Sequence, residues 1–153
     1  GSQGFELDIT GNVTDTLSMW LSYAYVDAET KNDYTDFISF AFIPAGSDLL
    51  NIAEQQFSLQ LAQQTNIAGK EVTLIGGVPH VGDRSGEFGD PTFRLPSYTT
   101  VRVAAAFDVT DSIGLRAEIN NLFDEEYYTN SFADVWVQPG APQNFRLTAD
   151  FRF

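Results

Sequence analysis

Asn144-Phe145-Arg146-Leu147-Thr148-Ala149-Asp150-Phe151-Arg152-Phe153, at the end of the sequence, alternates strictly between two kinds of residue. Apolar residues occupy the odd-numbered positions, and polar or charged residues occupy the even-numbered positions. Because successive side chains of a β-strand point to opposite faces, this alternation predicts a strand with one apolar face and one charged face.

The same alternation recurs upstream of this segment. Six further segments carry it, at residues 5–13, 17–25, 56–61, 71–78, 100–108 and 113–120. None of them has the spacing of an amphipathic helix. The apolar segment 37–43 predicts a further short strand. The chain is therefore predicted to be all-β and antiparallel, with about seven strands, or eight if residues 37–43 join the sheet.

The connections between these segments alternate in length. Those at 13–16, 65–70 and 109–112 are short, and those at 27–53, 82–97 and 123–143 are long. In an up-and-down meander, all short turns then lie at one end and all long loops at the other. This asymmetry is typical of transmembrane β-barrels, whose tilted strands of about ten residues cross a hydrocarbon layer of roughly 30 Å.

The distribution of charge favours the same interpretation. An arginine that faces lipid at the membrane midplane costs about 2–4 kcal/mol. The apolar faces carry no charge, whereas the opposite faces carry Glu6, Asp8, Arg102, Asp108, Arg116, Glu118, Arg146, Asp150 and Arg152. Alternation alone also fits a soluble sandwich or a lipocalin-like barrel, in which the apolar face is the core. The loop asymmetry favours the transmembrane barrel.

Composition excludes several other classes of protein. Eight Lys and Arg against 21 Asp and Glu give a net charge of −13, which is unsuited to neutralising the phosphates of a nucleic acid. The absence of cysteine excludes disulfide scaffolds and thiolate zinc sites, and the single His80 disfavours a catalytic triad. No catalytic residue and no resident metal site are therefore predicted.

Several sequence blocks form a more specific combination than any single strand. They are Asn121-Leu122-Phe123-Asp124-Glu125-Glu126-Tyr127-Tyr128, Pro139-Gly140-Ala141-Pro142, the final 145–153, and, further upstream, Phe93-Arg94-Leu95-Pro96-Ser97-Tyr98-Thr99 and Gly4-Phe5-Glu6-Leu7-Asp8. Together they resemble the C-terminal part of a TonB-dependent outer-membrane receptor of the ferric-siderophore type. The resemblance extends over essentially the whole chain.

The resemblance implies a barrel of roughly 22 strands around a separate N-terminal plug domain. Residues 1–153 would be the C-terminal part of that barrel, with the plug domain and signal peptide outside this chain. The implied location is the outer membrane of a Gram-negative bacterium, in contact with its lipid. The implied partners are a ferric siderophore as transported ligand, the TonB complex through the plug, and the barrel-assembly machinery. No bond of the ligand is broken, so no enzyme and no cofactor are expected.

Three sets of residues have roles under this resemblance. The terminal aromatic strand, which the assembly machinery would recognise, contributes Phe145, Leu147, Phe151 and Phe153. The wall of the barrel interior, against which the plug would dock, contributes Trp20, Arg102, Arg116, Glu118, Arg146, Asp150 and Arg152, and cross-strand pairs of opposite charge are expected among the last six. The ligand-binding mouth contributes the aromatic side chains of the third long loop, Tyr127, Tyr128, Phe132 and Trp136.

Each of these sets has a simpler alternative. The terminal aromatics also suit ordinary lipid contact, Trp20 also suits packing on its neighbours, and the loop aromatics also suit packing of the loop or an outer aromatic girdle. The loops hold only Lys31, Arg84 and Arg94 as cations, which favours a neutral hydroxamate or mixed ligand over a strongly anionic one.

Two weaker alternatives concern the acidic loops. The long loops carry nine of the 13 net negative charges. Asp83, Glu87 and Asp90 in the glycine-rich loop have the ligand type of a divalent-cation site, although a solvated loop is the simpler explanation. A small outer-membrane barrel that acts as an adhesin or structural protein through its acidic loops is the alternative function.

Overall fold

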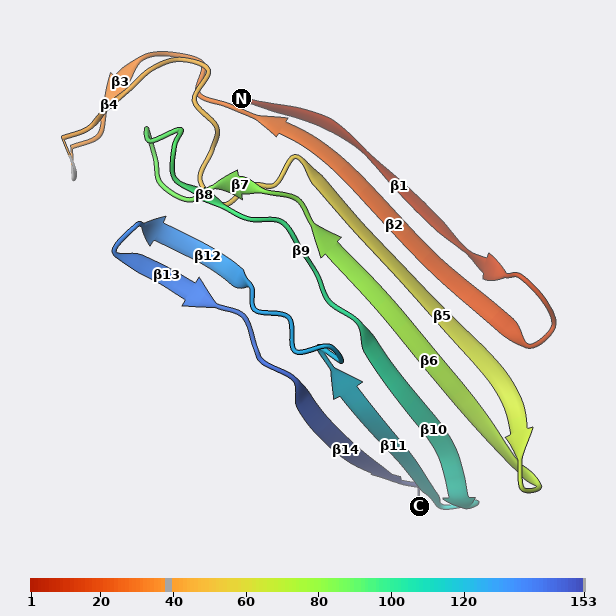
Figure 1. Ribbon diagram of the computed structural model, residues 1–153. Helices are drawn as coiled ribbons and strands as arrows, with labels where there is room; N and C mark the ends of the chain where they lie inside the picture. Colours follow the sequence, from red (N-terminus) through yellow and green to blue (C-terminus); the bar gives the residue numbers. More distant parts are fainter. Residues whose placement is uncertain (38–39, 153) are drawn as a thin grey trace.

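The computed structural model describes residues 1–37 and 40–152, and its main element is an antiparallel sheet (Figure 1). The strands pair in the order β1-β2-β5-β6-β10-β11-β14, with the short β9 beside β6. Their bounds are β1 (Ser2–Asn12), β2 (Leu17–Ala28), β5 (Gln55–Ile67), β6 (Lys70–Val81), β9 (Tyr98–Thr99), β10 (Arg102–Thr110), β11 (Ile113–Asn120) and β14 (Asn144–Phe151). Because the spatial order is the chain order, the sheet is the predicted meander, and the all-β antiparallel prediction is confirmed.

Several strands are longer than the alternation indicates, and β5 exceeds it most. β5 runs to Ile67 although Gln63 and Gln64 interrupt the contrast between its faces, because it pairs with β6 without a break from Gln56↔Val81 to Ile67↔Lys70. Backbone pairing with a long neighbour therefore extends β5 beyond its periodic part.

Within the described residues, no helix is long and apolar enough to cross a membrane.

The three long connections lie together at one end of the sheet, as expected (Figure 1). We call them the first loop (29–54), the second loop (82–101) and the third loop (121–143), and together the loop end. Each contains a small hairpin. These are β3 (Tyr34–Thr35) with β4 (Phe42–Ile43), β7 (Arg84–Ser85) with β8 (Arg94–Leu95), and β12 (Tyr128–Ala133) with β13 (Trp136–Pro139).

Two loop predictions need correction. Of the strand predicted at 37–43, only Phe42–Ile43 forms among the described residues, and it pairs with Tyr34–Thr35 and not with the main sheet. Ile38 and Ser39 lie outside the described residues. The third loop is not without regular structure, because it contains the β12–β13 hairpin. Irregular register in that hairpin, between Tyr128 and Asn130 and again between Ser131 and Ala133, removes the alternation that would have revealed it.

The register places the predicted apolar positions of the paired strands on one side of the sheet. One row of paired residues on that side runs through Met19, Leu61, Gly76, Val103, Ile119 and Phe145. The adjacent row on the other side runs through Trp20, Gln60, Gly77 and Arg102. We call these two sides the apolar face and the polar face.

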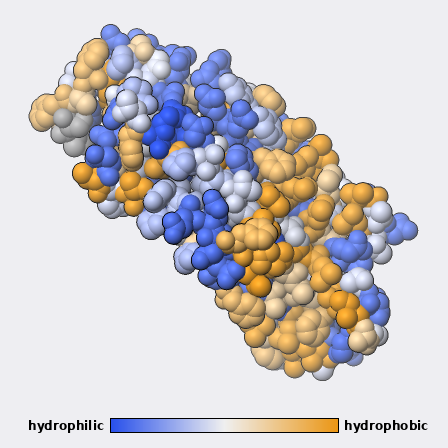
Figure 2. Space-filling view, in the orientation of Figure 1, coloured by the Kyte–Doolittle hydropathy of each residue, from blue (hydrophilic) through white to orange (hydrophobic). Residues whose placement is uncertain are grey.

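Burial differs sharply between the sheet and the loop end. The most buried hydrophobic side chains are Ile43, Ala53 and Leu95, at 1%, 1% and 2% exposure, and all three belong to the loops. The apolar face instead leaves Phe5, Phe145 and other large side chains exposed. Hydrophobic residues gather over the strands in Figure 2, and hydrophilic ones over the loop end. A soluble sandwich, which would bury this face under a second layer, is not what the described chain forms.

Candidate functional site

The base of the third loop is fixed by the Asn-Leu-Phe-Asp block. Asn121 adopts a positive φ of 50° directly after β11, and its side chain is 5% exposed. Its amide nitrogen donates to the carbonyls of Glu125 and Ala141 at 2.9 and 3.1 Å, and its amide oxygen accepts from the Glu125 N–H at 2.9 Å. Asp124, also at positive φ, accepts from the Gln143 N–H at 2.7 Å. The two ends of the loop are therefore joined at its base.

Tyr127 packs just above this base. Its ring stacks on Tyr98 of the second loop, with centroids 4.3 Å apart. It also lies over Gly140, where a Cβ atom would come within 2.2 Å of the Tyr127 ring. The ring of Tyr127 is thus occupied by contacts within the loop end.

The β12–β13 hairpin is attached to the second loop by Arg84 and Ser131. The Arg84 guanidinium donates to the carbonyls of Tyr128 and Thr129 at 2.6 and 3.0 Å, and it lies 5.6 Å from the centroid of the Tyr98 ring. The Ser131 hydroxyl of β12 donates to the Gly86 carbonyl of the second loop. Ser131 and Arg84 are each 2% exposed.

Asn51 attaches the same hairpin to the first loop. Its side chain bonds both backbone groups of Ser131, donating to the carbonyl at 2.7 Å and accepting from the N–H at 2.9 Å. Its own backbone N–H donates to the Ser85 carbonyl at 3.0 Å. Asn51 has a positive φ of 62°, a conformation that asparagine tolerates better than most residues. The three loops therefore meet at one junction, which we define as Asn51, Arg84, Ser85 and Ser131.

The cations of the loop end are all engaged within the protein. Arg94 pairs with Asp48 and Asp83 at 2.8 and 2.7 Å, and these two carboxylates raise its pKa. Lys31 lies 3.5 Å from Glu29. Burial lowers the pKa of Arg84, whose hydrogen bonds go to backbone carbonyls. Lys31, Arg84 and Arg94, the loop cations singled out from the sequence, all lie among the described residues.

The suggested divalent-cation site is not assembled. Asp83 is paired with Arg94, Glu87 accepts from the Asp134 N–H at 3.2 Å, and Asp90 accepts from Thr92. The Thr92 bonds lower the pKa of Asp90. Among residues 1–37 and 40–152, no group of three acidic or histidine side chains is placed to hold a metal ion.

The other three candidate ligand-binding aromatics keep exposed side chains on the hairpin. Tyr128, Phe132 and Trp136 are 42%, 64% and 57% exposed. The structure therefore brings these three onto one small element, and their role as ligand contacts stays a prediction.

On the polar face, the predicted wall residues form local pairs. Arg116 and Glu118 pair at 2.8 Å along β11, two residues apart, and Glu118 is 7% exposed. Although Arg146 stands opposite Glu118 in the register, the salt bridge of Glu118 goes to Arg116 and not across the strands. The ion pair of Glu118 therefore runs along β11, and cross-strand pairing among these six residues stays a prediction.

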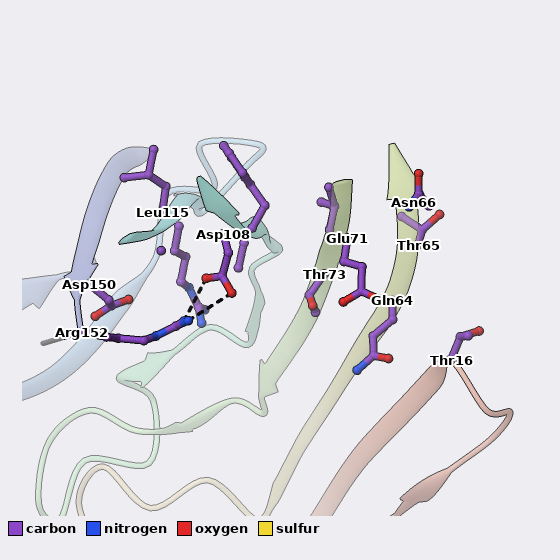
Figure 3. Close-up of a pocket in the computed structure, with 15 residues that line it drawn as sticks. Thr16, Gln64, Thr65, Asn66, Glu71, Thr73, Asp108, Leu115, Asp150 and Arg152 are labelled. Atoms are coloured by element: carbon purple, nitrogen blue, oxygen red, sulfur yellow. Dashed lines mark hydrogen bonds and ion pairs between the residues drawn. The ribbon is translucent and has the colours of Figure 1, made fainter. Parts of the chain in front are cut away.

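Two glycines allow longer-range contacts across the polar face. Arg102 donates to Gln60 over Gly77, where a Cβ atom would come within 3.0 Å of Arg102 Nε. Arg152 pairs with Asp108 at 2.9 Å over Gly114 of the strand between them (Figure 3). Trp20 lies beside Gln60 in the same row as Arg102 and is 40% exposed.

The polar face is hollowed at the end with the short turns. A hollow of about 580 Å³ lies there, with Asp108, Asp150 and Arg152 on one side and Gln64, Glu71 and Thr73 on the other (Figure 3). Arg116 also lines it. On the apolar face, Phe145, Leu147 and Phe151 of β14 are 65%, 64% and 63% exposed, whereas Phe153 lies outside the described residues.

Comparison with known proteins identifies the family. The model of the family "TonB dependent receptor-like, beta-barrel" matches residues 1–122. The chain belongs to this family. TonB-dependent receptors are transporters of the Gram-negative outer membrane and not enzymes, so the resemblance, the location and the absence of enzymatic function expected from the sequence are confirmed.

Individual TonB-dependent receptors agree with this assignment. The chain is 35% identical, over 99% of its length, to the metal-pseudopaline receptor CntO of Pseudomonas aeruginosa, and 28% identical, over 99%, to the ferrichrome outer membrane transporter/phage receptor of Escherichia coli. The crystal structure of the siderophore receptor PiuA from Acinetobacter baumannii superposes with a TM-score of 0.84 at 23% identity, covering 98% of the chain. The chain spans about a fifth of each relative, 21%, 20% and 21% respectively.

The junction of the three loops is the part of this receptor segment that sequence reasoning missed. Asn51 carries no pattern in the sequence, and charge alone marks Arg84 only as a cation available to the ligand. For the polar-face contacts of Arg102 and Arg152, Gly77 inside β6 and Gly114 near the start of β11 were an available signal, because a glycine inside a strand often marks a close approach of other groups.

Proposed function

We propose that this chain forms the C-terminal part of the barrel of a receptor that takes up a chelated metal ion. The loop end forms part of its outer mouth, and the plug domain lies N-terminal to this segment. The ligand is a ferric siderophore or a metal–pseudopaline complex, in line with the ligands named for the relatives PiuA and CntO.

The observation that carries this proposal is the arrangement of the third loop. Its hairpin presents Tyr128, Phe132 and Trp136 with exposed side chains, while Lys31, Arg84 and Arg94 are engaged elsewhere. Aromatic groups suit a chelate with a broad, partly apolar surface. The surrounding loops are acidic, so a neutral or weakly charged chelate is favoured over a strongly anionic one.

The polar face supports the expected partnership with a plug. Its charged pairs and the hollow at the short-turn end offer a hydrated, polar wall to a domain inside the barrel. In this proposal Trp20, Arg102, Arg116, Glu118, Arg146, Asp150 and Arg152 line that wall, and the TonB complex acts through the plug. Phe145, Leu147, Phe151 and Phe153 belong to the terminal segment that the assembly machinery recognises.

The test uses the full-length receptor in a Gram-negative strain that lacks its own siderophore receptors. Uptake of radiolabelled ferrichrome and of metal–pseudopaline loaded with iron(III), zinc(II) or nickel(II) is measured, with a strain lacking TonB as control. We expect TonB-dependent uptake of at least one chelate. If deletion of the parent gene leaves metal acquisition unchanged and abolishes surface adhesion instead, the adhesin alternative is correct.

A further inference from the structure

The second loop contains a buried arginine whose partners are backbone carbonyls. Arg84 is 2% exposed, and within the described chain no carboxylate pairs with its guanidinium. A charge removed from water carries a large desolvation cost unless hydrogen bonds replace the lost hydration. Here the carbonyls of Tyr128 and Thr129 and the face of Tyr98 supply that replacement. Arg84 and the first residues of β12 therefore hold each other in place.

These carbonyls belong to the hairpin that carries the exposed aromatic rings. Tyr128 and Thr129 begin β12, and the same short hairpin carries the exposed rings of Phe132 and Trp136. β12 and β13 pair only with each other, so the hairpin gains no hydrogen bonds from the main sheet. Its orientation depends on side-chain contacts, chiefly those of Arg84, Asn51 and Ser131.

We propose that Arg84 is a positioning residue for chelate recognition, which orients the β12–β13 hairpin so that Tyr128, Phe132 and Trp136 present their rings to the ligand. This inference rests on the proposed function. Arg84 itself does not touch the ligand. It acts by ordering the hairpin before the ligand arrives, which reduces the entropy lost on binding.

The experiment uses the full-length receptor with the variants Arg84→Gln and Arg84→Lys, and Lys31→Gln as the control. Lys31 is also a loop cation, but its ion pair with Glu29 is exposed to solvent. Binding of ferrichrome and metal–pseudopaline is measured by tryptophan fluorescence on purified receptor. Hairpin mobility is measured by a spin label at Val135→Cys, a position that is 88% exposed at the hairpin tip, with any native cysteines outside this cysteine-free chain replaced.

We expect Arg84→Gln to weaken binding by at least about tenfold, which is about 1.4 kcal/mol, and to increase the mobility of the label. Arg84→Lys keeps the charge but lacks the planar guanidinium that faces the Tyr98 ring while it donates to the Tyr128 and Thr129 carbonyls, so it restores part of both losses. Lys31→Gln leaves both measurements unchanged. If Arg84→Gln fails to fold, chelate affinity and label mobility are compared instead between Asn51→Ala, which cuts the hairpin from the first loop, and the Lys31→Gln control.

Four results would overturn or redirect the inference. Binding by Arg84→Gln within about twofold of the wild type contradicts it, as does an increase in label mobility with no loss of affinity. An equal loss of affinity in Lys31→Gln shows that loop charge matters and not the hairpin. If the wild type binds no chelate while Arg84→Gln still frees the hairpin, the proposed function fails but the orienting contact stands.

Discussion

The main sheet and the loop end of this chain are stabilised in opposite ways. The sheet is a single layer whose two faces stay largely exposed, and its strands are joined by backbone pairing with chain neighbours. The loop end buries Ile43, Ala53 and Leu95 and is joined by side chains that bridge distant segments. The difference shows that the sheet relies on its surroundings, lipid on one face and the barrel interior on the other, whereas the loops supply their own core.

The largest expected effect tests the two faces of the sheet against each other. Leu59 lies on the apolar face in the middle of β5, and Ser58 lies next to it on the polar face. We expect Leu59→Arg to destabilise the folded receptor by about 2–4 kcal/mol in lipid vesicles, because the guanidinium enters hydrocarbon. Ser58→Arg should cost far less. Denaturant unfolding of both variants measures the difference, and equal losses would contradict the assignment of faces.

The next effect tests whether the loop end can lose its structure while the sheet stays folded. Asn121→Ala removes three hydrogen bonds of a buried side chain and leaves a positive φ that alanine disfavours. We expect a loss of about 1–3 kcal/mol that is confined to the third loop. Limited proteolysis should cut residues 122–143 faster while the barrel stays intact. Asn120→Ala, which loses the side-chain bonds of Asn120 to Asn144 and Glu118 but none inside the third loop, is the control and should be cut at the wild-type rate.

A smaller effect separates two neighbouring glycines of β6. A Cβ atom at Gly77 would come within 3.0 Å of Arg102 Nε, whereas one at Gly76 would meet nothing within 4 Å. We expect Gly77→Ala to break the Arg102–Gln60 contact and cost about 1 kcal/mol. Gly76→Ala should be neutral or slightly stabilising, since alanine restricts the unfolded chain. Denaturant unfolding of both variants measures this, and the midpoint of Gly77→Ala should be the lower one. A lower midpoint for Gly76→Ala would refute the role of Gly77.

The smallest effect concerns the exposed pair between Arg152 and Asp108. Both side chains are more than half exposed, at 57% and 56%, so water and salt screen their attraction. We expect Arg152→Gln to lower the stability of the receptor only at low ionic strength. Unfolding in low and high NaCl measures this, and a salt-independent loss would mean that Arg152 acts through packing and not through charge.

Sequence predicted those parts of the molecule whose structure follows from residues that are close together in the chain. Alternation identifies the seven strands and their faces because strand geometry repeats every two residues, as in Phe145 to Phe151. The junction was not predictable, since Asn51 and Ser131 are 80 residues apart and Arg84 and Tyr128 are 44 apart. Tyr127 resembles its neighbour Tyr128 in the sequence, and only the stack on Tyr98 distinguishes them.

The alternation of β14 also protects the sheet against mispairing. A slip of β14 by one residue along β11 would turn Arg146 and Asp150 toward lipid and Phe145 toward the barrel interior. A single arginine that faces lipid at the midplane costs about 2–4 kcal/mol, so the membrane disfavours the shifted pairing. A slip by two residues keeps the faces but moves Arg152 about 7 Å along the strand, away from Asp108. One strand thus carries two separate penalties against the wrong alignment.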